Sequence, residues 1–150
     1  GSIRDAESLL DQVFGMENAV TLESVEQIIG KVGFAKINAL AGHIVSRDVD
    51  AALAFIANIN DAGQNIAQLN KDTIHYLRRV LALRVSPQTE EIFKNELTET
   101  ELAEMKKLAN GVDVDRHIIL LKNLIAAYAQ MRYSPFPHIP MEVAIIESLK

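Results

Sequence analysis

The chain of 150 residues is 49% hydrophobic but only 5% aromatic, and it contains no cysteine, which excludes disulfides and thiolate metal sites. Its net charge is −5 at pH 7, and its 15 basic side chains are scattered, which argues against a dedicated DNA-binding surface because neutralising phosphates needs a positive face. The longest apolar runs, 118–121 and 124–127, are too short to span a bilayer and no targeting segment is visible, so we expect a cytoplasmic protein without a membrane segment.

The first predicted helix runs from Ile3 to Phe14. Ser2 is a good N-cap, and Asp5 three positions later completes a pair that resembles a capping box. Arg4 lies in the first turn, off the apolar stripe of the helix, where a forked guanidinium and the positive helix end can together attract a phosphate. From spacing alone, a solvated surface charge is the simpler interpretation of Arg4.

A second helix is predicted to begin at Thr21, with an apolar stripe that runs to Ile29. Gly30 and Gly33 then interrupt the pattern, and two glycines in four residues loosen the backbone. We therefore predict a domain boundary here, with residues 1–32 in one domain and residues 33–150 in another.

Three helices are predicted next, over Phe34–Ser46, Val49–Asp61 and Asn65–Val85. The first two are expected to form a helical hairpin, each with one apolar face. The third ends before Ser86 because Pro87 disfavours helix in the residue that precedes it.

Pro87 also fits the first turn of a short helix that reaches Phe93. Thr98 and Glu101 form a capping box that opens a helix ending at Asn110, before Gly111. The most apolar helix, about Arg116–Arg132, follows a cap at Asp113 or Asp115. It is apolar on more than one face, so we expect it to be central or to lie against another subunit.

Three prolines, at 135, 137 and 140, are expected to form a rigid extended connection, and the last helix, Met141–Leu149, is predicted to have Pro140 at its first position. No segment alternates with period two for long enough to be a strand. We therefore predict an all-α fold, a helical bundle.

Side chains that could carry chemistry are isolated. The histidines have no second ligand three or four positions away, so we expect no metal site and interpret them as surface or satisfied core residues: His43, His75, His117 and His138. No glycine-rich phosphate loop occurs, so this sequence cannot hold a nucleotide by itself. We predict no catalytic residue, no metal and no cofactor in it.

The densest basic groups are Arg78, Arg79 and Arg84 on one predicted helix and Lys106 with Lys107 on another. We interpret both groups as solvated helix faces, with contact between the arginines and an acidic partner subunit as the alternative. Direct contact of these residues with DNA is not expected.

The opening twelve residues, Gly1–Gln12, resemble the sensor-2 helix of the bacterial DNA polymerase III gamma/tau subunit, the AAA+ ATPase of the sliding-clamp loader. They differ from the usual family string only at Ile3 and Glu7, where the family has methionine and leucine. A weaker match, over residues 137–144, resembles the opening of the last helix in the collar domain of the same subunit.

The resemblance implies that residues 1–32 are the C-terminal part of the AAA+ lid and that residues 33–150 are the helical collar, or oligomerisation, domain. It implies that Arg4 is a sensor-2 arginine that contacts ATP held by another module of the parent subunit. The implied partners are other loader subunits, namely gamma/tau copies, delta and delta prime, with the sliding clamp and DNA reached through the ATPase module. The fragment itself is then no enzyme, although its parent is an ATPase subunit.

One alternative from a different functional class is a free-standing helical adaptor that binds a partner helix, with the opening residues matching by chance. A small helical enzyme is a third possibility, and no residue favours it.

Overall fold

The computed structural model describes residues 22–150, with side chains from Gly33 onward. Contacts divide the chain into two compact units, Gly1–Lys36 and Ile37–Lys150. In the first unit, the described residues 22–36 are all helical.

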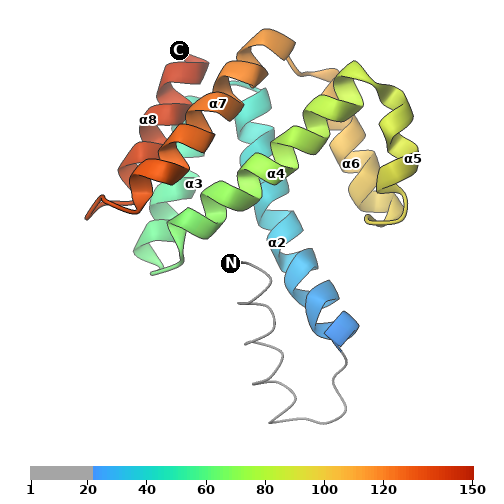
Figure 1. Ribbon diagram of the computed structural model, residues 1–150, viewed down its shortest axis with the longest axis horizontal. Coiled ribbons are helices and arrows are strands. Elements are labelled where there is room, and N and C mark those ends of the chain that lie inside the picture. The colour runs from blue at the N-terminus through green and yellow to red at the C-terminus, as the bar shows by residue number, and fades with distance from the viewer. Residues whose placement is uncertain (1–21) are drawn as a thin grey trace. The chain divides into compact units, whose positions relative to one another are not determined.

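The described part of the chain is all-α, as predicted, and residues 22–150 contain no strand (Figure 1). No helix in this range is both long and apolar enough to cross a membrane. The elements in chain order are α2 (Leu22–Val45), α3 (Val49–Asp61), α4 (Ile66–Val85), the 3₁₀ turn η1 (Pro87–Thr89), α5 (Glu90–Phe93), α6 (Glu99–Asn110), α7 (Val114–Met131) and α8 (His138–Leu149).

Helix α2 is continuous across Gly30 and Gly33, so the predicted interruption of the helix there is wrong. A glycine costs a helix only about 1 kcal/mol relative to alanine, which a long helix with a packed face tolerates. The packed face of α2 begins just after Gly33, where Ile37, Leu40 and Ile44 are buried. The domain boundary placed after residue 32 stays a prediction.

The core of the second unit lies where α4, α7 and α8 meet. Helix α7 packs against α4 on one side and α8 on another, while α8 also contacts α3 and α4 contacts α6 (Figure 1). The largest fully buried apolar side chains come from these helices and from α2: Leu40, Ile56, Leu77, Val80, Met105, Leu120, Leu124, Met141 and Ile145. Each such side chain stabilises the fold by about 1.5–3 kcal/mol through removal of apolar surface from water.

Local signals set most helix ends. Thr98 and Glu101 form the predicted capping box, with the Thr98 side chain accepting from the Glu101 amide and the Glu101 carboxylate accepting from the Thr98 amide. Of the two candidate caps for α7, Asp113 is the one used. Both arrangements satisfy amide groups that the first helical turn leaves without partners.

Helix α8 begins at His138, three residues before the predicted start. Pro140 is therefore its third residue, and the expectation that it belongs to an extended connection is wrong. Proline fits at this place because the amides of a first helical turn have no intrahelical acceptor, so a missing N–H costs nothing there.

Candidate subunit interface

Helix α7 has two different apolar faces. Its inner face packs into the core through buried residues three or four positions apart: His117, Leu120, Leu124, Ala127 and Met131. This spacing follows one side of a helix with 3.6 residues per turn. The remaining apolar residues of α7 must therefore point elsewhere.

Two buried polar side chains hold α7 on α4. One hydrogen bond is donated by α4 to α7, and the other is donated by α7 to α4. Asn70 of α4 donates a hydrogen bond to the Leu124 carbonyl of α7 at 2.9 Å. His117 of α7 donates from Nε2 to the Leu77 carbonyl of α4 at 2.8 Å. Burial lowers the pKa of His117, and the hydrogen bond to Leu77 opposes that shift in part, so His117 acts as a neutral donor.

A second set of contacts holds α7 against α8. Asn123 donates to the Ser148 hydroxyl at 3.0 Å, and Ser148 in turn donates to the Ala144 carbonyl at 2.7 Å. Arg116 donates to the carbonyl of Lys150 at 3.3 Å, where α8 has just ended. Within residues 37–150, α4 and α8 therefore cover two sides of α7 and leave exposed side chains on the third side.

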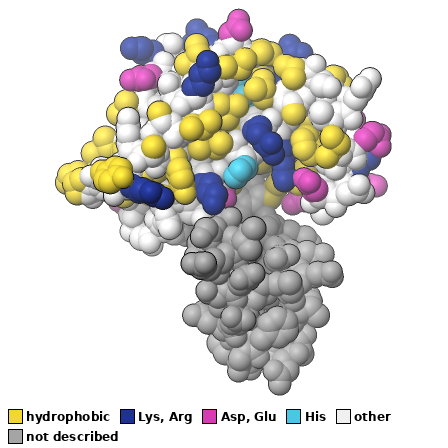
Figure 2. Space-filling model, viewed as in Figure 1, with side chains coloured by type: hydrophobic (Ala, Val, Ile, Leu, Met, Phe, Trp, Pro, Cys, Tyr) yellow, Lys and Arg dark blue, Asp and Glu magenta, His cyan; other side chains and the backbone are white. Residues whose placement is uncertain are grey.

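We call this third side the outer face of α7. It is mainly apolar but also carries one acid and one lysine, and its members are Asp115, Ile118, Ile119, Leu121, Lys122, Ile125, Ala126, Tyr128 and Ala129. Ile125 is 57% exposed, and Ile118 and Tyr128 are also exposed. Figure 2 shows hydrophobic side chains gathered on the side of the molecule that carries α7 and α4. Exposed apolar surface of this kind is typical of a binding site for another protein, a membrane or a ligand.

The loop between α7 and α8 extends this surface with two aromatic side chains. Tyr133 is 86% exposed and Phe136 is 56% exposed. The Phe136 ring meets His138 edge to face, with centroids 6.4 Å apart, and its amide donates to the Ser134 hydroxyl. Pro135 and Pro137 restrict the backbone on both sides of Phe136.

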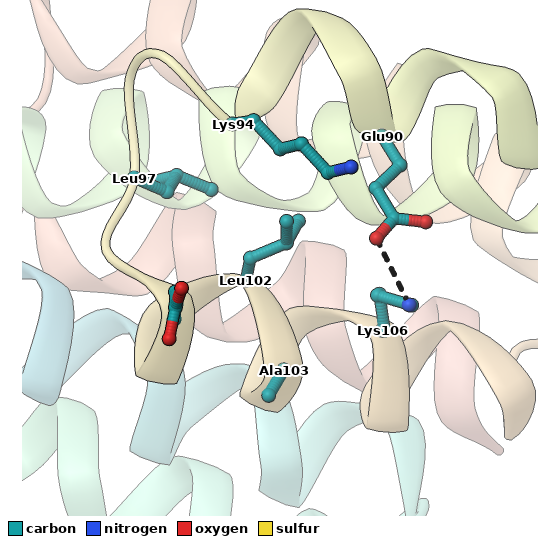
Figure 3. Close-up of a pocket in the computed structure, with 7 residues that line it drawn as sticks. Glu90, Lys94, Leu97, Leu102, Ala103 and Lys106 are labelled. Atoms are coloured by element: carbon teal, nitrogen blue, oxygen red, sulfur yellow. Dashed lines mark hydrogen bonds and ion pairs between the residues drawn. The ribbon is translucent and has the colours of Figure 1, made fainter.

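A separate groove lies between α5 and α6, with a volume of about 350 Å³ (Figure 3). Its apolar lining comes from Leu97, Leu102 and Ala103. Its charged lining includes Glu90, whose carboxylate pairs with Lys106 across the groove at 3.1 Å. The remaining lining residues are Lys94 and Glu99.

The residues singled out from the sequence are not brought together into one site. Arg4, the predicted nucleotide sensor, lies outside the described residues. His117 is a satisfied core side chain and His75 is exposed, as the sequence interpretation allowed. Among the described residues, no group of three or more His, Asp or Glu side chains is placed to hold a metal ion.

The arginine group of α4 is only partly a solvated face. Arg78 and Arg84 are exposed, but the Arg79 guanidinium pairs with Glu96 at 2.9 Å and lies over the Phe93 ring at 5.7 Å. Arg79 therefore has partners within its own chain, which fix the α5 region to α4. The interpretation of Arg79 as a solvated side chain was wrong, because the spacing of residues along α4 does not reveal where α5 packs.

The apolar sequence of α7 indicated surface beyond its core face, whereas the groove and the aromatic loop were not predicted. The Tyr-Ser-Pro-Phe-Pro string at 133–137 could have indicated an exposed aromatic loop, because prolines exclude a helix and leave the aromatic residues uncovered. The groove had no such signal, because it exists only where α5 and α6 pack side by side.

A family model described as DNA polymerase III subunits gamma and tau domain III matches residues 20–149. The chain belongs to this family. It is also 27% identical over 149 residues to the DNA polymerase III subunit tau of Bacillus subtilis (strain 168). That alignment covers 98% of the chain but 26% of the relative, so the chain spans about a quarter of the length of the tau subunit that it matches.

Proposed function

We propose that this chain works by assembly, as the part of a clamp-loader gamma/tau subunit that joins subunits to one another. The observation that carries the proposal is the outer face of α7, an apolar helix face held rigidly from behind by α4 and α8. Apolar helix faces of this kind resemble a domain core cut in half, as obligate interfaces do. The domain III family assignment supports the same role.

In this proposal the parent subunit belongs to a cytoplasmic complex that acts in DNA replication. Copies of gamma/tau assemble with delta and delta prime through domain III. ATP bound in the AAA+ module of the parent, and sensed by Arg4, drives motions that open the sliding clamp and load it on primed DNA. The described residues contribute the fixed contacts and no catalytic group.

The adaptor alternative required the opening twelve residues to match by chance. The family match lies within residues 20–149 and does not use those twelve residues. Two separate parts of the chain therefore indicate the same family, which favours the replication role over the adaptor.

The test is to place a charge on the outer face of α7. Ile125→Asp should dissociate the assembled chain, because a carboxylate cannot be buried there without a partner. Its fold should persist, since Ile125 is exposed and makes little core contact. Sedimentation velocity would give the oligomeric state, and circular dichroism would report the fold.

Ala57→Asp is the matched control, because Ala57 is exposed on α3, away from α7. It should assemble as the wild-type chain does. Unchanged assembly of Ile125→Asp would overturn the proposal.

A further inference from the structure

We infer that the exposed side of α4 binds a single strand of nucleic acid through Lys71, His75 and Arg78. These three residues, which we call the α4 row, follow one another at spacings of four and three positions, so they lie on one side of the helix. His75 and Arg78 are exposed and Lys71 is partly exposed. The inference rests on the proposed function for the source of the strand, primed DNA, but the binding itself requires no assembly.

Helix α4 concentrates positive charge in a chain that is acidic as a whole. It contains Lys71, Arg78, Arg79 and Arg84 against the single acid Asp72, a net charge of +3, whereas the whole chain has a net charge of −5. Basic residues that are scattered along the sequence can still share a surface, because a helix brings positions three or four apart together. Binding of a phosphate backbone depends on such a local positive surface.

The two cations of the α4 row are available to a ligand. In residues 33–150, neither Lys71 nor Arg78 forms an ion pair with a carboxylate. Arg79 and Arg84, in contrast, both have partners in their own chain. Asp72 points roughly a quarter turn away from the row, and its carboxylate already accepts a hydrogen bond from the neighbouring turn of α4 at 2.8 Å.

The order of the side chains along the α4 row fits a strand whose bases are unpaired. Lys71 and Arg78 are about 10 Å apart along the helix axis, far enough to hold two phosphates of one strand. Between them, the exposed His75 presents an imidazole ring on which an unstacked base can lie. Figure 2 shows basic side chains on both sides of a histidine on the face that carries α4.

The histidine ring also separates this ligand from two others with negative charge. A double helix keeps its bases stacked on one another, which leaves the ring of His75 without a partner. An acidic protein segment could pair with Lys71 and Arg78, but a carboxylate side chain has no broad flat face to stack on the ring. A single strand uses all three side chains of the α4 row.

The first experiment measures the two phosphate contacts through their dependence on salt. A fluorescein-labelled oligothymidylate about 20 nucleotides long is titrated with the 150-residue chain, and fluorescence anisotropy gives Kd from about 20 to 200 mM salt. Lys71→Gln with Arg78→Gln should raise Kd about tenfold or more at low salt. It should also reduce the slope of log affinity against log salt by about 1.4, since each phosphate contact on a single strand contributes about 0.7.

Matched variants separate the α4 row from general charge effects. Lys106→Gln with Lys107→Gln makes the same change in net charge on α6 and should keep the wild-type Kd and slope. Lys71→Arg with Arg78→Lys keeps both charges and should restore most of the binding. Circular dichroism would confirm that each variant is folded. An equal loss of affinity in the α4 and α6 variants would overturn the inference.

The second experiment tests the contact between His75 and a base. His75→Ala should raise Kd for the oligothymidylate about fivefold or more without changing the salt slope, because it removes a stacking surface and no phosphate contact. It should leave Kd unchanged for an abasic oligomer of the same length. Equal loss with both oligomers, or displacement of the oligothymidylate by polyglutamate of equal charge, would show a surface for acidic ligands in general and overturn the inference.

The outcome is independent of the test of the proposed function. If Ile125→Asp dissociates the assembled chain but the wild-type chain binds no oligothymidylate, the inference fails and the proposed function stands. If Ile125→Asp leaves assembly unchanged while Lys71→Gln with Arg78→Gln loses binding, the proposed function fails and the α4 row is still a site for single-stranded nucleic acid.

Discussion

At the scale of single residues, the place of α7 is set by a few polar side chains within an apolar core. Asn70 and His117 each bond a main-chain carbonyl of the facing helix. Such a bond contributes only about 0.5–1.5 kcal/mol, but an unpaired polar group in the core costs more. The two bonds therefore select one position of α7 on α4, whereas leucine and alanine contacts alone would tolerate several.

The burial of His117 makes stability depend on pH. Its pKa is lower in the folded chain than in the unfolded chain, because burial disfavours the charged ring. Below the unfolded value of about 6.5, the unfolded state binds more protons, so the free energy of unfolding should fall as pH decreases through this range. His117→Gln should reduce that fall, as measured by urea denaturation from pH 7.5 to pH 5.

The exposed His75 provides the comparison for this test. His75→Gln should keep the wild-type dependence on pH. An identical slope in His117→Gln and in the wild-type chain would show that the buried ring does not control stability in acid.

At the scale of helices, the ends that were predicted well are those with a local chemical signal. Helix α3 has the bounds predicted for it, and the Thr98 capping box opens α6 as expected. Helix α2 was predicted less well, because glycine is only a weak local signal and the packing that follows it overrides it. The start of α8 differs because proline fits any place in a first helical turn.

The capping box gives a quantitative test of one helix end. Thr98→Ala removes the acceptor of the Glu101 amide, and we expect it to lower the free energy of unfolding by about 1 kcal/mol. Thr98→Ser should retain most of that energy, because the hydroxyl remains. Chemical denaturation of the three proteins would measure both differences, and equal loss in the two variants would contradict the role of the hydroxyl.

The contrast between local sequence signals and packing also explains which parts of the candidate site could be predicted. The outer face of α7 could be expected from the sequence, since this helix is apolar on more than one face and a small bundle cannot bury all of that surface. The groove and the Arg79 contacts were not visible, because residues of α4, α5 and α6 meet there only after folding.

At the scale of the whole molecule, the proposed function assigns nucleotide sensing to Arg4 and subunit assembly to the outer face of α7. Two substitutions should distinguish these roles. Arg4→Ala in the full-length subunit should impair ATP-dependent clamp loading but leave assembly intact, if Arg4 senses the nucleotide. Ile125→Asp, in contrast, should disrupt the assembly of the subunits. Loading rates, ATP affinity and sedimentation would be compared for both, and equal ATP affinity and loading rate in Arg4→Ala and wild type would show that Arg4 is no sensor.

The distribution of tyrosine gives the chain an intrinsic optical reporter. It has three tyrosines and no tryptophan, so tyrosine dominates its near-ultraviolet emission. Tyr76 is buried and its hydroxyl donates to Asn38, whereas Tyr128 and Tyr133 lie on or beside the outer face of α7. A collisional quencher such as iodide should therefore reach two rings in the separated chain and fewer after association, so dilution can be followed by fluorescence without any attached dye.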